Sequence, residues 1–361
     1  MPDEEECLAR LRLMRTHGIG PVGFRRLLAS HGSAVAAMAA LQSEGRKLAP
    51  PAQITAEMAQ VRNIGARYLH LGSADYPPLL AALADPPPAL IVRGDAALAR
   101  RPVVAIVGAR NASVAGRRLA HDMAQELGAA GWVVASGLAR GIDVAAHRGA
   151  FATGTIACIA GGIDIAYPPE HAKLQQGIAA EGLVLSEFPP GTEPLARHFP
   201  RRNRLISGTA RGLVVIEAAQ GSGSLITARF AADAGREVMA VPGHPADPRS
   251  RGGNGLIRDG AMLVENAADV LAVLAPFALL AEESPPRRRA RVARPVVAAP
   301  VTPAPAGVDA ALLDLLSTAG VALDELVRVS GRSAAEVQAQ LSDLELEGRV
   351  VRLAGGRVAR A

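Results

Sequence analysis

Six short apolar runs between residues 102 and 243 constrain the fold more than any other feature of this sequence. They read PVVAIVG, WVVASG, GTIACIAGG, LVLSEF, RGLVVIEA and REVMAVPG, and each is followed by a loop or by a helical pattern. Continuous apolar runs of this length indicate strands that are covered on both faces, in a parallel sheet with right-handed crossovers. The sequence therefore predicts an α/β fold with a doubly wound, Rossmann-like sheet, in which functional groups lie outside the carboxyl ends of the strands.

The regions around these runs divide the chain into four predicted segments. Residues 1–75 form a small helical domain, and residues 76–280 form the Rossmann-like domain. Residues 281–307 are rich in proline, alanine and arginine without periodicity, which predicts a disordered linker. Residues 308–361 show three helical patterns and a glycine-turn hairpin, which together resemble a winged-helix domain.

The helical domain has apolar residues three and four apart in the stretches 8–16, 24–32, 34–41 and 54–61. Gly18 and Gly20 bracket Ile19 between the first two stretches, and such a hairpin can hold a phosphate on its backbone N–H groups. This pattern is typical of a helix-hairpin-helix or SAM-like unit, although a plain helix turn explains it as well. The stretch DYPPLLAALADPPPAL, with five prolines, predicts an irregular connection to the sheet.

The net charge of +5 does not by itself indicate a polyanion partner. Residues 285–308 contain five arginines and no acid, so the rest of the chain sums to zero. Only local clusters of arginine can therefore argue for nucleic acid. One such cluster is RHFPRRNRLISG, residues 197–208, which contains no acid.

In this cluster, guanidinium groups can grip phosphate through paired bonds, and an aromatic ring can stack on an unpaired base. Pro200 suits the first turn of a helix, and helical spacing then places Arg201 and Arg204 on one face. A solvated, arginine-rich helix start is the alternative interpretation. The candidate DNA-binding residues of the cluster are Arg197, Phe199, Arg201, Arg202, Asn203 and Arg204.

Loops at the predicted strand ends supply further anion-binding candidates. After the first strand, Arg110 stands where a dinucleotide fingerprint needs its second glycine, so a nicotinamide or flavin enzyme is not expected and no cofactor is predicted. Gly108, Arg110 and the helix start behind Ser113 instead predict a site for an external phosphate. A single loop of this kind is more often a plain turn, but several at one sheet edge favour a binding surface. The other candidates are Ser136, Gly137 and Arg140 after the second strand, and Ser222 and Ser224 before a later helix.

The ordered motifs VGARNAS, SGLARGIDVAAH, GGIDIAYPPEH, SEFPPG, FPRRNRLISG, VVIEAAQGSGSLITA, REVMAVPGHP and GGNGLIRDGA resemble the DNA-processing protein A family, DprA, also called Smf. This resemblance covers residues 75–275 densely, and the helical and winged-helix flanks are similar to those of the family. It implies a non-enzymatic protein that binds single-stranded DNA, protects it and loads the RecA recombinase as a homodimer during natural transformation. The family often has a lysine just before FPxRN, whereas this chain has only Arg197 or His198 to replace it.

Two other functions remain open from the residues. The sheet also resembles nucleotide phosphoribohydrolases, but their PGGxGTxxE loop reads GSGSLITA here, without the glutamate. Glu217 could act as a base, although a capping or ion-pairing role is the more common one. A duplex-reading regulator is less favoured, because residues 309–361 carry eight acids and six arginines.

The location expected from the sequence is the cytoplasm. Cys7 and Cys158 are the only cysteines, which predicts neither a disulfide framework nor a thiolate metal cluster. The acidic start is unlike a secretory signal, and no apolar run is long enough to span a membrane, so no membrane partner is expected.

Overall fold

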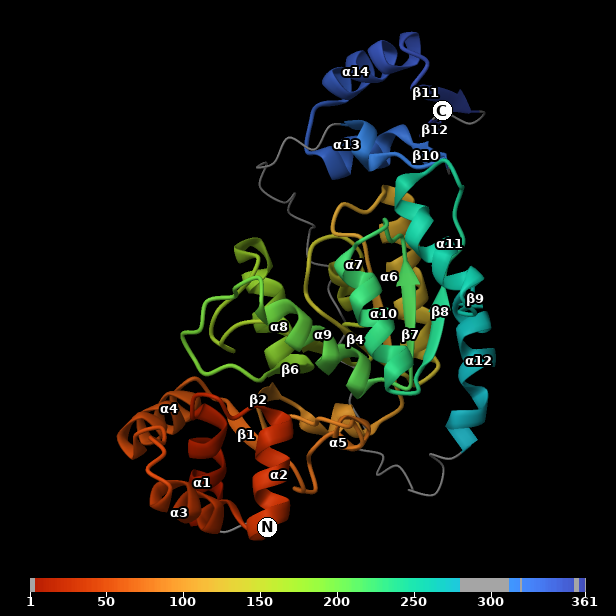
Figure 1. Ribbon diagram of the computed structural model, residues 1–361. Coiled ribbons are helices and arrows are strands. Elements are labelled where there is room, and N and C mark those ends of the chain that lie inside the picture. The colour runs from red at the N-terminus through yellow and green to blue at the C-terminus, as the bar shows by residue number, and fades with distance from the viewer. Residues whose placement is uncertain (1–3, 280–311, 319, 354–356, 361) are drawn as a thin grey trace, which may run out of the picture.

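A computed structural model of the protein describes residues 4–279, 312–318, 320–353 and 357–360. Figure 1 shows a helical part in red, a central sheet flanked by helices, and a small C-terminal part in blue. The predicted linker 281–307 lies outside the described residues.

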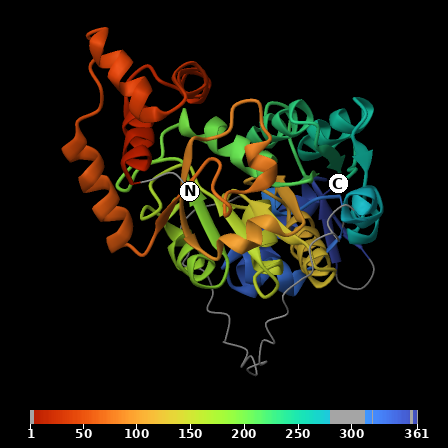
Figure 2. The ribbon, with the colours of Figure 1, turned by 90° about the horizontal axis from the view of Figure 1, so that it is seen from below.

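The helical part contains the four helices that the sequence predicts, each somewhat longer than its apolar pattern. Their small core gathers around Phe24, which is 2% exposed, with Leu13 of the first helix. The fourth helix is tied to the first by an ion pair between Arg15 and Glu57 at 2.6 Å. Figure 2 shows this part as a lobe beside the sheet. The helices are α1 (Glu4–Arg15), α2 (Pro21–His31), α3 (Ala34–Ser43) and α4 (Pro51–Asn63).

The central sheet contains all six strands that the sequence predicts, and these six run parallel. Their order across the sheet is β6-β5-β4-β3-β7-β8. The doubly wound, Rossmann-like fold is thereby confirmed. The strands are β3 (Val103–Gly108), β4 (Val133–Ser136), β5 (Thr155–Cys158), β6 (Leu183–Ser186), β7 (Gly212–Ile216) and β8 (Glu237–Ala240).

Three further strands extend this sheet to nine, and the sequence analysis missed all of them. β1 (Arg67–His70) and β2 (Ala89–Gly94) form an antiparallel pair, and β2 runs antiparallel to β6. β2 begins directly after Pro88, so the proline-rich stretch is only partly irregular and also contains α5 (Pro78–Ala81). Because β1 pairs into the sheet, the sheet begins within the range 1–75 that was predicted to be helical. β9 (Met262–Leu263) has two residues and adds to β8.

Alternate residues of each buried strand serve two cores, one on each face of the sheet. In β3, Val103, Ala105 and Val107 pack with α5, α9 and α10, whereas Val104 and Ile106 pack with α6, α7 and α12. Among the described residues, no helix combines the length and apolarity needed to cross a bilayer. The helices are α6 (Val114–Ala129), α7 (Ile142–Gly149), α8 (Ala172–Glu181), α9 (His198–Thr209), α10 (Gly223–Asp233), α11 (Arg251–Arg258) and α12 (Ala267–Leu279).

The C-terminal part has its own apolar cluster and a three-stranded sheet of order β10-β12-β11. Its hairpin and its last two helices agree with the sequence prediction. The first predicted helix differs, since its described part is the short 3₁₀ turn η4 (Leu312–Leu315). The remaining elements are β10 (Val321–Ala322), α13 (Leu323–Ser330), α14 (Ala334–Leu346), β11 (Val350–Leu353) and β12 (Arg357–Arg360).

Candidate functional site

The strand order reverses between β3 and β7, and the candidate site lies beyond the carboxyl ends of these strands. Ligands of doubly wound sheets bind at such reversals. Gly108 ends β3 opposite Ile216, where a Cβ would lie 1.8 Å from the Ile216 carbonyl oxygen. Glycine is therefore needed at 108 so that the two strand ends can approach each other.

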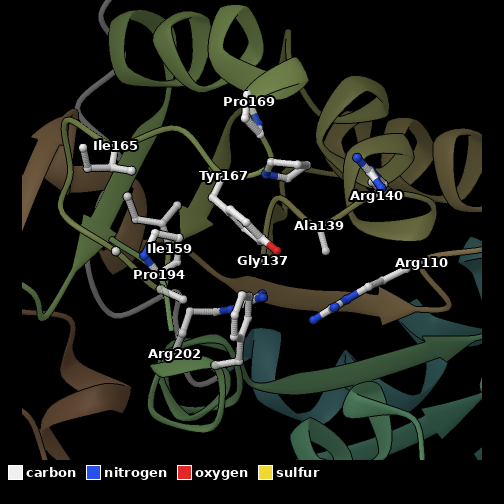
Figure 3. A pocket seen from close by; sticks show the side chains of 14 residues that line it. Arg110, Gly137, Ala139, Arg140, Ile159, Ile165, Tyr167, Pro169, Pro194 and Arg202 are labelled. Atoms are coloured by element: carbon white, nitrogen blue, oxygen red, sulfur yellow. The ribbon is translucent and has the colours of Figure 1, made fainter. Parts of the chain in front are cut away.

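A groove of about 940 Å³ opens over this reversal, at the upper end of the size range of ligand pockets. Its walls are the loop after β3, one face of α9, the start of α10 and residues 247–249, with Asp314 and Arg360 from the winged-helix part. A deeper pocket of about 160 Å³ adjoins it. Figure 3 shows Arg110, Arg140 and Arg202, from three separate segments, around the ring of Tyr167. The groove and the pocket share Arg110, Ala139, Tyr167, Pro194, Phe199 and Arg202.

One face of α9 lines the groove, with Phe199, Arg202, Asn203 and Ile206 at helical spacing. Phe199 lines both the groove and the deeper pocket. The guanidinium carbons of Arg110 and Arg202 lie 5.2 Å and 5.7 Å from the centre of its ring, and the Tyr167 ring meets it edge-on at 5.7 Å. The arrangement therefore places cations and aromatic faces side by side in one groove.

Arg202 forms the floor between groove and pocket, and its side chain is only 6% exposed. Its guanidinium lies 3.7 Å from the Asp143 carboxylate. Burial lowers the pKa of Arg202, and the charge of Asp143 opposes that shift. A Cβ at Gly137 would lie 1.2 Å from Nη1 of Arg202, so glycine at 137 makes room for the guanidinium. Within the described ranges, no three His, Cys, Asp or Glu side chains gather as a metal ion requires.

Arg201 and Arg204 share a face of α9, as predicted, but that face turns away from the groove. Both point to Glu187 Oε1, Arg204 at 2.9 Å and Arg201 at 3.8 Å. Arg204 also pairs with Asp85 at 2.6 Å, and its side chain is 11% exposed. The expectation that Arg204 and Arg201 offer their charges to DNA is therefore corrected. Arg204 is already paired with the carboxylates of Asp85 and Glu187, and Arg201 lies over the Phe188 ring and is not among the groove-lining residues.

Arg197 and His198, the two residues before FPxRN, differ in their exposure. His198 is buried and stacks on Phe188 at 4.3 Å between ring centres, and burial lowers the pKa of His198. Arg197 is exposed at the start of α9 and is not among the groove-lining residues. Of the two candidates for the family's upstream lysine, only Arg197 is accessible to a ligand.

The loop after β4 also contains one predicted residue that is buried and two that line a cavity. Ser136 is fully buried and donates its hydroxyl to the Ile106 carbonyl at 2.6 Å, so it does not reach the groove. Gly137 and Arg140 line the deeper pocket, where Arg140 is half exposed and paired with Glu170. The prediction that Ser136 is a site residue is therefore wrong, because its hydroxyl is part of the core.

The loop that opens α10 lines the groove next to α9. Ser222 and Ser224 line the groove, and their hydroxyls are 2.5 Å apart. Asn203 donates its side-chain amide to the Gly223 carbonyl at 3.2 Å, which fixes this loop against α9. These hydroxyls are hydrogen-bonding groups of the kind that contact phosphate oxygens.

The predicted phosphate site at the start of α6 is filled by the protein itself. The Glu217 carboxylate accepts a hydrogen bond from the Ser113 backbone N–H at 2.8 Å and another from the Ser113 hydroxyl. Glu217 adopts a left-handed backbone, with φ at 48°, to reach this position. The expectation of an external phosphate there is wrong, and Glu217 is a capping group rather than a free base.

Several groove residues escaped the sequence analysis. Tyr167 sits in the YPPE segment after β5, where an aromatic at a strand end was available as a signal. Arg249 and Arg360 come from segments outside every strand-end motif, and no local pattern marks them. Arg360 reaches the groove only because the winged-helix part packs against the sheet domain.

Comparison with known proteins agrees with this architecture. Residues 67–275 match the profile of the family described as DNA recombination-mediator protein A, residues 4–59 a DprA-like N-terminal HHH domain, and residues 296–356 a DprA winged helix domain. The DNA processing protein DprA of Bacillus subtilis is 40% identical over 235 residues, which cover 64% of this chain and 78% of that protein. Protein Smf of Escherichia coli is 37% identical over 298 residues, which cover 80% and 77%.

Two solved structures are similar along most of their own length. The X-ray structure of DprA from Streptococcus pneumoniae has a TM-score of 0.65 and 33% identity, covering 75% of this chain and 98% of that one. DprA from Helicobacter pylori, described for its single-stranded DNA binding mode, has a TM-score of 0.53 and 30% identity, covering 58% and 97%. The chain therefore belongs to the DNA recombination-mediator protein A family, DprA, whose members are also called Smf.

Proposed function

We propose that this chain binds single-stranded DNA in the groove, protects incoming strands and loads the RecA recombinase onto them during natural transformation. It acts in the cytoplasm, as a homodimer and without catalysis. The DNA-contacting groups are Gly108, Arg110, Gly137, Arg140, Phe199, Arg202, Asn203, Ser222 and Ser224, with Arg197 at the rim.

The observation that carries this proposal is the Phe199 ring with two guanidinium groups beside it. Single strands present both unpaired base faces and phosphates, whereas in a duplex the base faces are stacked. A groove that combines rings with cations suits the first ligand. Few of the groove's side chains are amides that could read base edges, so the binding should be largely independent of sequence.

The similarity to the Helicobacter pylori protein supports the same ligand, since that structure is described for its single-stranded DNA binding mode. The domain ranges 1–75, 76–280 and 308–361 remain part of the proposal, except that β1, residues 67–70, belongs to the sheet domain, which is the DNA-binding unit.

The test is a titration with fluorescent single-stranded and duplex oligonucleotides at two salt concentrations. The single strand should bind more tightly, and Arg110→Ala should lower the log–log salt slope by roughly 0.7, the value for one lost phosphate contact. Arg110→Lys should recover only part of the affinity, because a point charge cannot make the paired contact. Equal affinity for the two ligands would reject the proposal.

The phosphoribohydrolase alternative is less well supported, because Glu217 is engaged with Ser113. Incubation with adenosine or cytidine monophosphate should release no free base. Release that rises with protein concentration and is abolished by Glu217→Gln would restore the enzyme. RecA loading is tested separately, by RecA filament formation on single strands with and without this protein.

A further inference from the structure

The winged-helix part docks on the sheet domain beside the groove, which its Asp314 and Arg360 help to line. Val114, the first residue of α6, is 3% exposed and belongs to the same apolar cluster as Leu312, Leu316 and Leu326. A weak, exposed ion pair joins Arg118 of α6 to Glu325 of α13 at 3.8 Å. Figure 1 shows this part lying next to α11 and α6. Val114 is the apolar contact of the sheet domain with this cluster, so the apolar part of the interface is small.

Arg249 supplies the directional part of this contact. Its Nη1 donates to the Asp314 carbonyl at 2.8 Å, and its Nη2 donates to the Leu316 carbonyl. The same guanidinium is held by the Asp247 carboxylate through Nε at 3.1 Å and Nη2 at 2.9 Å. The Arg249 side chain is 11% exposed and that of Asp247 is 4% exposed, so the whole cluster is shielded from water. The Arg249 guanidinium therefore links the sheet domain to the winged-helix part through hydrogen bonds to both.

The docked position carries a further cation to the groove. Arg360, at the end of β12, is one of the groove-lining residues. Its backbone N–H donates to the Ser317 carbonyl at 2.8 Å, one residue beyond a carbonyl that Arg249 holds. Arg360 and Arg249 therefore bind the carbonyls of two successive residues, Ser317 and Leu316, so the position of Arg360 depends on the contact that Arg249 makes.

We propose that the winged-helix domain is the far wall of the single-strand groove, that Arg249 holds it there, and that Arg360 contacts the backbone of a bound strand. Arg249 is a positioning residue, and Arg360 is an additional DNA-binding residue. The inference rests on the proposed function, because it needs a single strand in the groove. The groove has a volume of about 940 Å³ with the domain in place, so docking leaves room for the strand.

Two pairs of variants of the full chain test this. Arg249→Ala is matched by Arg251→Ala, which makes the same charge change at an exposed position two residues away. Arg360→Ala is matched by Arg349→Ala, an exposed arginine of the same domain with a side chain 54% exposed. Docking is followed by small-angle X-ray scattering without DNA, and binding by titration with an oligothymidylate.

Arg249→Ala should increase the radius of gyration and weaken binding at least as much as Arg360→Ala. Arg360→Ala should leave the scattering unchanged, weaken binding by about threefold and lower the salt slope by roughly 0.7. Both controls should behave as the wild-type protein does. Arg249→Lys, which keeps the charge but not the fork of donors, should undock partly and remains informative if the alanine variant does not fold.

Unchanged scattering for both Arg249 variants would overturn the role of Arg249 in docking. Wild-type affinity and slope for Arg360→Ala, or tighter binding by Arg249→Ala, would overturn the role of the wall. If Arg110→Ala also binds as the wild-type protein does, the proposed groove itself fails. That result is distinct, because the scattering of the Arg249 variants is measured without DNA.

Discussion

The floor and the rim of the deeper pocket hold their arginines in opposite ways. On the floor, Arg202 is 6% exposed and faces a carboxylate that is equally buried. On the rim, the Arg140 side chain is 53% exposed and its partner Glu170 is 39% exposed. The two cations line the same cavity, yet one is enclosed by protein and the other is half exposed.

This difference separates stability from binding. A buried ion pair costs several kcal/mol when one partner is removed, whereas an exposed pair contributes about 1 kcal/mol or less. The floor should therefore act on folding and on binding together, and the rim on binding alone. Four predictions test this division.

The largest effect is expected for Arg202→Met, which leaves Asp143 buried without its partner. The free energy of unfolding should fall by about 3 kcal/mol or more in urea denaturation. Single-strand affinity should fall too, because a groove cation is lost. Arg201→Met, at a side chain 51% exposed outside the groove, is the matched control and should change neither quantity strongly.

Adding Asp143→Asn to Arg202→Met removes the unpaired charge. The double variant should regain much of the stability but none of the single-strand affinity. If it binds DNA as the wild-type protein does, Arg202 is a structural residue only.

The second prediction is a dependence of stability on pH that arises from His147, a buried residue influenced by the charge of Arg202. Burial, followed by the charge of Arg202, lowers the pKa of His147 to about 3, and its Nδ1 lies 2.7 Å from the Thr155 hydroxyl. The unfolded chain binds a proton near pH 6.5 and the folded chain does not, so stability should fall as the pH drops below 6.5. Between pH 7 and pH 5 this residue should cost about 2 kcal/mol of unfolding free energy.

Urea denaturation of His147→Gln at both pH values measures that cost. The variant should lose less stability than the wild-type protein between pH 7 and pH 5. Parallel curves for the two proteins would show that His147 does not resist protonation.

The third effect is expected at the ring of Phe199, between floor and rim. Phe199→Leu should weaken single-strand binding by about 1 to 2 kcal/mol, because a base loses its stacking surface. The salt slope should stay the same, in contrast to Arg110→Ala. Phe230→Leu makes the same change on α10 outside the groove and should bind normally. A lowered slope for Phe199→Leu would mean that the ring mainly positions its neighbouring arginines.

The smallest effect is expected at the rim. Arg140→Ala should reduce affinity by less than about 1 kcal/mol and leave the unfolding free energy unchanged. Glu170→Gln should tighten binding slightly, because it releases Arg140 to the strand. Strong destabilisation by either change would contradict the distinction between floor and rim.

The sequence allowed the α/β sheet to be predicted because buried parallel strands have continuous apolar runs. It did not reveal β2, because this strand starts directly after the prolines that end at Pro88. β1 was missed because it has only four residues, two of them basic. β9 has only two residues, too few for any periodicity.

At the site, local spacing predicted Phe199, Arg202 and Asn203 on α9. It could not distinguish them from Arg204, whose burial depends on Asp85, 119 residues away. Arg360 was missed for the same reason, since tertiary packing alone brings it to the groove. The residue types indicated that cations and aromatic rings were present. Long-range ion pairs determine which of these side chains face the groove.

Glu217 has a consequence for selectivity among anions in the cell. In dinucleotide-binding relatives of this sheet, the helix that follows the first parallel strand receives a pyrophosphate. Here the corresponding helix, α6, begins against the protein's own carboxylate. A free nucleotide that approached it would meet like charge at the place where it would otherwise be held. Small phosphate compounds should therefore compete poorly at this position, and the remaining cations of the groove should favour a polymer that reaches several of them at once.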